Sequence, residues 1–189
     1  MQSLDKEKLI QEVRDKGVEI NNINELKKIN LKYRDLVSIL LKHLVEIENE
    51  NDKEFLVRCL GVKGFVEASK TLINEFCKSH NLTFKWAIGN TLSIIQDESI
   101  ITELINIAKE KKHGIARQMI VDGLGSFKDE NVKVTLIELL NDEEVVGHAI
   151  SGLSRMGDKS LIKYIEPFRS YKVKWVRKEA EKAIKKLNK

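Results

Sequence analysis

Hydrophobic residues recur along the chain with a period of about 30 residues, which is the length of a two-helix repeat. Each period opens with an apolar residue that is followed four positions later by Leu or Ile. The five pairs are Leu56/Leu60, Ile88/Leu92, Ile120/Leu124, Ala149/Leu153 and Ala180/Ile184. Their second members are 32, 32, 29 and 31 residues apart. Residues four apart share one face of a helix, so the pattern predicts a helix with one buried face in every period.

A second apolar column predicts a second helix in each period. It consists of Leu72, Leu104, Leu136 and Ile165. In three periods an aspartate seven residues earlier marks the turn between the helices, and these are Asp97, Asp129 and Asp158. The clearest period predicts helices over residues 116–127 and 132–140. A pair of this size cannot bury both of its faces alone, so the pairs are expected to stack and share one continuous core.

The residue just before each Leu or Ile of the first column is small, as close packing between neighbouring helices requires. This column reads Cys59, Thr91, Gly123, Gly152 and Ala183. Residues 36–47 carry an apolar stripe in register with the second column. Residues 1–33 are less regular, and they are interpreted as an N-terminal helical cap. Residues 34–189 are expected to form the repeat array as a single continuous domain.

Three segments resemble a known family. The segment ARQMIVDGLGSFKDENVKVTLIELLNDEEV is similar to a HEAT repeat, of the short type also found in phycobilisome-lyase-like proteins. VGHAISGLSRMGDKSLIKYI and VRKEAEKAIKKL follow the same pattern, and the resemblance covers roughly residues 35–189. It implies an all-α fold: an α-α superhelix, or HEAT-like solenoid, of about five helix pairs with an N-terminal helical cap. HEAT helices often carry a proline near their start, whereas this chain has only Pro167.

Charge is distributed unevenly over the 189 residues. The chain has 33 Lys+Arg and 29 Asp+Glu, a net charge of +4. Residues 163–189 contain ten basic and three acidic residues, which gives +7 and leaves −3 for residues 1–162. No apolar run approaches the ~20 residues that span a bilayer, and the chain starts without the apolar run of a signal peptide. A cytoplasmic protein without a membrane segment is therefore expected.

The helix with the VR..A..AL pattern usually lines the concave side of a HEAT array, and this resemblance implies which residues face a partner. The outward positions form a ladder, Glu54/Arg58, Trp86/Asn90, Gln118/Asp122, Gly147/Ser151 and Lys178/Lys182. The predicted partner-binding residues are Arg58, Trp86, Asn90, Gln118, Asp122, His148 and Arg155. Trp86 is the predicted anchor, because Trp concentrates binding energy at interfaces. Alternatively it packs into the seam between repeats, against Phe84 or Met119.

Two groups of basic residues each allow two interpretations. Lys53, Lys85, Arg117 and Arg177 occupy one column, and in the family such a residue pairs with an acid from an inter-repeat turn. Asp142 and Glu144 are available for this pairing, and a row of cations that binds phosphate is the alternative. The second group is the basic end, where phosphate or acidic-partner contacts are expected from Lys174, Arg177, Lys178, Lys182 and Lys185. Alternatively these residues interact with the helix dipole and keep the end soluble.

The sequence contains no nucleotide-binding, metalloprotease or serine-hydrolase motif and no Cys/His spacing typical of zinc. His148 lacks partner ligands at helical spacing, and Asp122 is the one acid kept as a candidate for acid–base chemistry. The favoured hypothesis is a non-catalytic scaffold or adaptor that binds a protein on its concave face, without cofactor or metal.

Two alternatives stay open. One is a nucleic-acid-binding protein related to HEAT-like alkylpurine DNA glycosylases. Trp86, Trp175, Asp122 and Arg155 offer the residue types that those enzymes use, but they do not match that family's motif residue by residue. The other is a lyase or chaperone for a bilin-carrying protein, by analogy with the repeat type.

Overall fold

A computed structural model describes residues 2–189, and all its regular elements are helical; these residues contain no strand. The helices form two compact units, residues 1–97 and 98–189. The first unit contains α1 (Lys6–Arg14), η1 (Ile23–Lys28), η2 (Leu31–Leu36), α2 (Val37–Glu46), α3 (Glu50–Cys59), η3 (Val66–Ala68), α4 (Ser69–Lys78) and α5 (Leu82–Ile95), where η denotes a 3₁₀ helix. The all-α fold predicted from the periodicity is confirmed.

The second unit contains more short 3₁₀ segments between its α-helices. Its elements are η4 (Glu98–Ile100), α6 (Ile101–Lys109), η5 (Lys111–Arg117), α7 (Gln118–Leu124), α8 (Glu130–Glu138), η6 (Leu139–Asn141), α9 (Val146–Met156), η7 (Lys159–Leu161), α10 (Ile162–Ile165), η8 (Glu166–Ser170) and α11 (Lys174–Leu187). The single continuous array over residues 34–189 stays a prediction.

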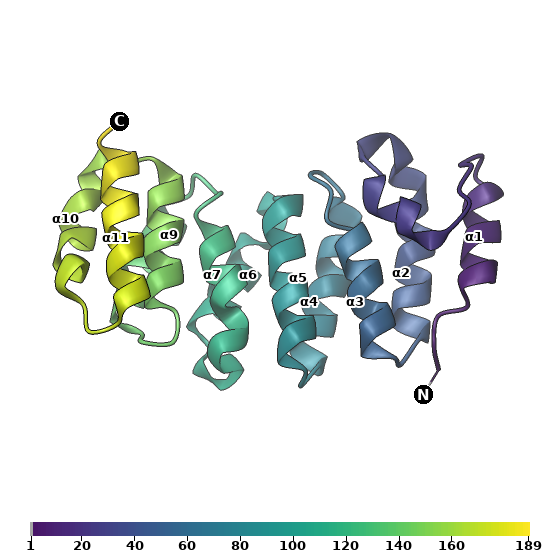
Figure 1. The fold of residues 1–189 in the computed structure, drawn as a ribbon, viewed down its shortest axis with the longest axis horizontal. Helices are drawn as coiled ribbons and strands as arrows, with labels where there is room; N and C mark the ends of the chain where they lie inside the picture. Colours follow the sequence, from purple (N-terminus) through teal and green to yellow (C-terminus); the bar gives the residue numbers. More distant parts are fainter. Residues whose placement is uncertain (1) are drawn as a thin grey trace. The chain divides into compact units, whose positions relative to one another are not determined.

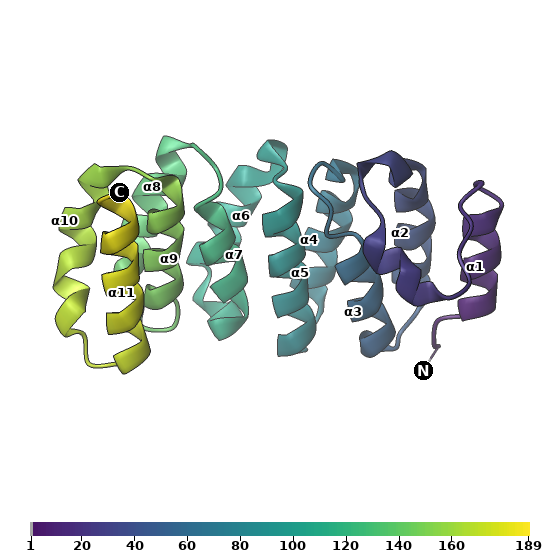
Figure 2. The same cartoon turned by 45° about the horizontal axis from the view of Figure 1, so that its top comes forward.

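Within each unit the helices pack in two rows (Figures 1 and 2). In the first unit α3 packs beside α5, α4 backs α5, and α2 lies between α1 and α3. In the second unit α7, α9 and α11 lie side by side, and α6, α8 and α10 form the row behind them. We call α3, α5, α7, α9 and α11 the ladder helices, because they carry the predicted ladder.

Asparagine and aspartate side chains set where several helices begin. Asn49 Oδ1 accepts from the backbone N–H of Asp52 at the start of α3, at 3.2 Å. Asn81 and Asp129 do the same for α5 and α8, each at 3.0 Å. Such caps satisfy N–H groups that have no partner inside the helix, and each stabilises by about 1 kcal/mol. Asp129, which the sequence places in a turn, is therefore the N-cap of α8.

The predicted apolar columns form the core of each unit. Every member of the second column is at most 2% exposed, and so are all members of the first column except Ile184, which is half-buried. All five residues of the small-residue column are buried as well. Cys59, in this column, is a free thiol whose pKa is raised to about 12 by burial. Cys59 therefore packs in the core as a small residue, as its column predicts.

Glycines allow a close approach between the C-terminal end of α7 and α9. A Cβ atom added at Gly125 would lie 2.1 Å from the backbone oxygen of Gly152. One added at Gly152 would lie 3.1 Å from Leu136 Cδ2 and from the backbone oxygen of Val121. The backbones of Gly125 and Gly152 are therefore in direct contact, and this contact sets how closely α9 approaches the end of α7.

No helix in residues 2–189 combines the length and the apolar content needed to cross a membrane.

Candidate functional site

The predicted partner-binding residues belong to two separate sets, one on each unit. Arg58, Trp86 and Asn90 lie on α3 and α5 of the first unit. Gln118, Asp122, His148 and Arg155 lie on α7 and α9 of the second unit. Each set is therefore described within its own unit.

The first set contains an open apolar surface around Trp86. The Trp86 residue is 42% exposed, as expected of a surface position and not of a seam. Leu82, one turn earlier on α5, is 45% exposed, and Ile94, two turns after Trp86, is 40% exposed. Asn90 lies half-buried between them on the same helix. We call Leu82, Trp86, Asn90 and Ile94 the Trp86 surface.

Arg58 on the neighbouring helix α3 forms an ion pair with a residue of the same helix. Its Nε and Nη2 atoms donate to Glu54 Oε1, at 2.9 and 2.7 Å. The side chain remains about half exposed, so this pair contributes little to stability. Arg58 is therefore oriented, and it remains open to a carboxylate of a partner.

In the second set, Asp122 is neutralised by Arg155. The aspartate is 6% exposed, and its Oδ2 accepts from Arg155 Nη2 at 2.5 Å. The aspartate is thus largely covered, and one of its oxygen atoms already accepts a hydrogen bond within the unit. The candidate role of Asp122 in acid–base chemistry thus gains no support, and a partner would meet the exposed side of Arg155.

Gln118 is also used within the second unit. Its Nε2 donates to the backbone oxygen of Glu144 at 2.9 Å and so connects α7 to the start of α9. One of its two amide N–H groups is therefore already bonded, which leaves the other N–H and the amide oxygen for a partner.

His148 contacts an aromatic residue that the ladder did not include. Its ring meets Trp175 of α11 edge-on, with centroids 5.4 Å apart at 63°. Burial lowers the pKa of His148, although the negative charges of Asp122 and Glu179 act in the opposite direction. Its Nδ1 is buried without a hydrogen-bond partner among the described residues. His148 is therefore a half-buried ring that packs against Trp175.

Trp175 is the binding candidate that sequence reasoning underestimated. It is 48% exposed, yet its ring is seated on Gly147 of α9. A Cβ atom at Gly147 would lie 2.0 Å from Trp175 Cη2, so only glycine accommodates the ring in this position. A glycine at an outward ladder position was the available signal, because it implies that a neighbouring side chain lies over it. The Trp175 ring thus packs on Gly147 and leaves about half of the residue exposed to a partner.

The basic side chains of the column Lys53, Lys85, Arg117 and Arg177 form contacts within their own units. Arg117 is fully buried, and its Nη2 donates to Asp142 Oδ2 at 2.8 Å and to Glu144 Oε2 at 2.7 Å. Lys53 Nζ donates to Glu75 Oε2 at 2.6 Å. The remaining two members also have internal contacts. Lys85 Nζ lies 4.5 Å from the centroid of the Phe76 ring, and Arg177 Nη1 donates to the backbone oxygen of Tyr171 at 2.7 Å.

These contacts support the structural interpretation of the column. Arg117 pairs with the two acids named from the sequence, Asp142 and Glu144. A fully buried guanidinium cannot meet a phosphate without unfolding its surroundings. Arg177, which is also one of the predicted phosphate contacts, already donates twice to backbone oxygens, those of Tyr171 and Lys172.

The other basic residues of α11 are exposed to solvent. Lys174, Lys178 and Lys185 are exposed and have no ionic partner among the described residues. Lys182 lies 3.4 Å from Glu179, a long contact that stays largely solvated. Lys174, Lys178, Lys182 and Lys185 follow one another at spacings of four, four and three residues, so they share one helix face. This basic stripe begins next to Trp175.

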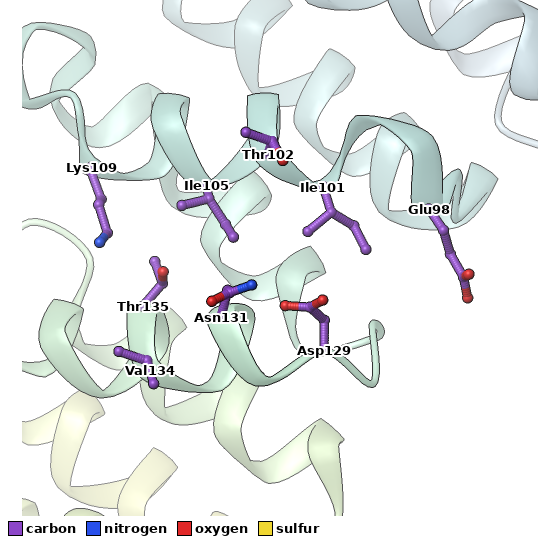
Figure 3. Close-up of a pocket in the computed structure, with 9 residues that line it drawn as sticks. All are labelled: Glu98, Ile101, Thr102, Ile105, Lys109, Asp129, Asn131, Val134 and Thr135. Carbon is purple, nitrogen blue, oxygen red and sulfur yellow. The ribbon is translucent and has the colours of Figure 1, made fainter.

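A groove with a volume of about 490 Å³ lies between α6 and α8 of the second unit, on the opposite row from the ladder helices (Figure 3). Its lining consists of Glu98, Ile101, Thr102, Ile105, Lys109, Asp129, Asn131, Val134 and Thr135. Ile101 and Ile105 point from α6 toward α8, and Asn131 and Thr135 extend from α8 toward α6 (Figure 3). Isoleucines of α6 thus face polar side chains of α8 across the groove.

Sequence reasoning placed no site on this row of helices. The signal that could have found the groove is the pair Ile101/Ile105, which lies off the buried column of Leu104. An exposed Val134, 47% accessible, is the matching signal on α8. Apolar residues that recur at helical spacing outside the core face indicate a second surface that a partner can cover.

The described residues contain no group of three His, Cys, Asp or Glu side chains that could hold a metal ion.

Residues 101–185 match the family model described as HEAT repeats. The match lies within the second unit and extends from the start of α6 almost to the end of α11. No curated protein is significantly similar to the chain. Residues 101–185 therefore consist of HEAT repeats, and the resemblance that the sequence suggested is confirmed for this segment.

Proposed function

We propose that this chain is a non-catalytic scaffold or adaptor that binds a protein partner on its ladder helices. HEAT repeats serve mainly as protein-interaction modules, and residues 101–185 consist of them. Within the first unit the Trp86 surface is the anchor of the contact, and Arg58 provides an adjacent charge. Within the second unit the partner meets Trp175 and Arg155.

The observation that carries this proposal is the exposure of Trp86. Tryptophan is usually largely buried, because removing its ring from water is strongly favourable. In this protein 42% of the residue stays in contact with water, beside a Leu82 that is equally exposed. Exposed aromatic residues within an apolar patch are typical of interface hot spots. The half-buried Asn90 beside them supplies a hydrogen-bonding amide that can orient the partner.

We expect Trp86→Ala to weaken binding of the native partner by about 2 kcal/mol or more, which is roughly 30-fold in Kd. The reason is the loss of the largest apolar contact area at the centre of the surface. The measurement is co-purification from the native host, followed by titration of the recovered partner by calorimetry. Because Trp86 is exposed, the substitution is expected to leave the free energy of unfolding within about 0.5 kcal/mol of wild type.

Val45→Ala is the matched control, since Val45 is a 54% exposed apolar residue on α2, outside the ladder. It should retain the same partner at the same affinity as wild type. Recovery of the same proteins in equal amounts with Trp86→Ala would show that Trp86 is not the anchor.

A second candidate function is contact with nucleic acid through the basic stripe of α11. The favouring observation is that Lys174, Lys178 and Lys185 are exposed and have no ionic partner among residues 2–189. Four neutralised phosphates give a slope of log K against log salt near −3.6 for duplex DNA, so binding would weaken steeply between ~50 and ~200 mM salt. Fluorescence anisotropy of a labelled duplex measures this slope. An absence of binding at ~50 mM salt, or a slope unchanged in Lys178→Glu, eliminates this function.

A further inference from the structure

We infer that Trp175 and the basic stripe of α11 bind an acidic segment of the protein partner, in which one large apolar side chain is followed by Asp or Glu residues. The inference rests on the proposed function, because it names the chemistry of the partner at the second unit. It depends on three features of α11: an exposed aromatic ring in a fixed position, an excess of positive charge, and the place of that charge along the helix.

The Trp175 ring is held by α9 before any partner binds. It packs on Gly147, where a Cβ atom would lie 2.0 Å from Trp175 Cη2, and it meets the His148 ring with centroids 5.4 Å apart. The residue nevertheless stays 48% exposed. A side chain that is already ordered loses little conformational entropy when a partner covers it. Trp175 is therefore suited to receive an apolar side chain.

The uncompensated charge of α7, α9 and α11 lies on α11. Apart from His148, α7 and α9 each contain one charged residue, Asp122 and Arg155, and these two pair with each other. In contrast, α11 contains six basic and two acidic residues, a net charge of +4. A partner that lies across these three helices therefore meets an excess of positive charge on α11, which an acidic segment complements.

The helix dipole accounts for only part of this charge. Lys185 and Lys186 lie in the last turn of α11, where the negative end of the dipole stabilises cations. Lys174 lies in the first turn and Lys178 follows one turn later, although the positive end of the dipole disfavours cations and the first turn contains no acidic residue. The position of Lys174 is therefore unfavourable in the free protein, and carboxylates of a partner would relieve the repulsion.

The spacing along α11 matches an extended segment. Trp175, Lys178 and Lys182 share one face, since Lys178 and Lys182 follow Trp175 by three and seven residues. The two lysines are about 6 Å apart along the helix axis, and alternate residues of an extended chain are about 7 Å apart on one side. An apolar residue followed at every second position by Asp or Glu therefore places its apolar side chain on Trp175 and its carboxylates beside the lysines. On an open helix face the backbone of the segment stays hydrated.

A strand of nucleic acid would also bring negative charge to the basic stripe. Single strands bind by stacking successive bases on aromatic rings. Trp175, however, is the only Trp, Tyr or Phe in α7, α9 and α11. The one arginine of α11, Arg177, already donates to two backbone oxygens. One ring beside a row of lysines therefore favours one apolar side chain followed by carboxylates.

The test measures the fluorescence of Trp175 in the full chain carrying Trp86→Phe, in which Trp175 is the only tryptophan. The probe is a synthetic peptide in which a leucine is followed by four glutamates at alternate positions, with serines between them. We expect a saturable change in emission at ~50 mM salt and weaker binding at ~200 mM salt. The same peptide with glutamine in place of glutamate, or with alanine in place of leucine, should bind at least about five-fold more weakly.

A double substitution ties the binding to the basic stripe. Lys178→Gln combined with Lys182→Gln should weaken binding of the acidic peptide at least about five-fold. Both lysines are exposed, so circular dichroism is expected to show the wild-type helix content. Lys63→Gln combined with Lys70→Gln removes the same charge from exposed positions of the first unit, and this matched control should leave the affinity unchanged.

The inference is overturned by an absence of saturable binding up to ~1 mM, by equal affinity for the glutamate and glutamine peptides, or by binding that the Lys178/Lys182 double substitution leaves unchanged. Tighter binding of an oligothymidine of equal length than of the acidic peptide would also overturn it, because the basic stripe would then be a nucleic-acid site.

Failure of this inference is distinguishable from failure of the proposed function. A chain that binds no acidic peptide but still recovers a Trp86-dependent partner loses only the inference about α11. A chain that binds the acidic peptide, while Trp86→Ala recovers the same proteins as wild type, loses only the anchor proposed for the first unit.

Discussion

Arg117→Met should lower the free energy of unfolding of the chain by about 3–5 kcal/mol, the largest effect that we expect from any single substitution in this protein. The guanidinium is fully buried, and it bonds two carboxylates, those of Asp142 and Glu144. It also donates to the backbone oxygens of Gly114 and Ala108, at 3.0 and 2.8 Å. Methionine fills a similar volume but donates no hydrogen bond, so two carbonyl groups and the 12%-exposed side chain of Asp142 lose their partner.

The measurement is urea denaturation followed by circular dichroism at 222 nm. Arg58→Met provides the control, because Arg58 belongs to an exposed i,i+4 pair that is expected to contribute less than about 0.5 kcal/mol. A loss below about 1 kcal/mol in Arg117→Met would contradict the claim that this cluster holds the start of α7 against the start of α9.

Gly125→Ala should destabilise the second unit by about 2 kcal/mol, although alanine is the better helix former. The backbone of Gly125 is already helical, with φ −61°, so propensity alone would favour alanine by up to about 1 kcal/mol. The added Cβ, however, would lie 2.1 Å from the backbone oxygen of Gly152, which cannot rotate away as a side chain can. Relief of this overlap requires α7 and α9 to separate, with a loss of packing along both helices.

Thermal and urea unfolding of Gly125→Ala both report this change. Ser126→Ala is the neighbouring control, and it should stay within about 0.5 kcal/mol of wild type. A Gly125→Ala protein that is as stable as wild type, or more stable, would show that the two helices do not meet through backbone contact at this position.

Much of the fold could be predicted, because helix burial follows directly from apolar spacing. The two columns identified the core, and small residues such as Gly123 and Gly152 marked where helices pack closely. The aspartate column predicted the turns between the helices, and the hydrogen bond from Val132 N–H to Asp129 Oδ1 shows why that position favours aspartate. These features are local, and each is set by residues within a few turns of one another.

The sites were less predictable, because they depend on contacts between residues that are distant in sequence. The exposure of Trp86 could be expected from its ladder position, but the seating of Trp175 on Gly147 depends on how closely α11 approaches α9. The neutralisation of Asp122 by Arg155 likewise joins residues 33 positions apart. The groove between α6 and α8 exists because Ile101 and Ile105 of α6 lie opposite Asn131 and Thr135 of α8, which no single helix reveals.

Photocrosslinking from position 86 tests most directly whether the Trp86 surface binds a protein. The chain carries a benzoyl-phenylalanine in place of Trp86, in the native host, and a second chain carries it at Lys70, an exposed position on α4 outside the ladder. We predict a discrete crosslinked protein from position 86 that is absent from position 70 and that disappears when Leu82→Glu is added. The same crosslinks from both positions, or none from position 86, would contradict the claim that the ladder helices hold a protein partner.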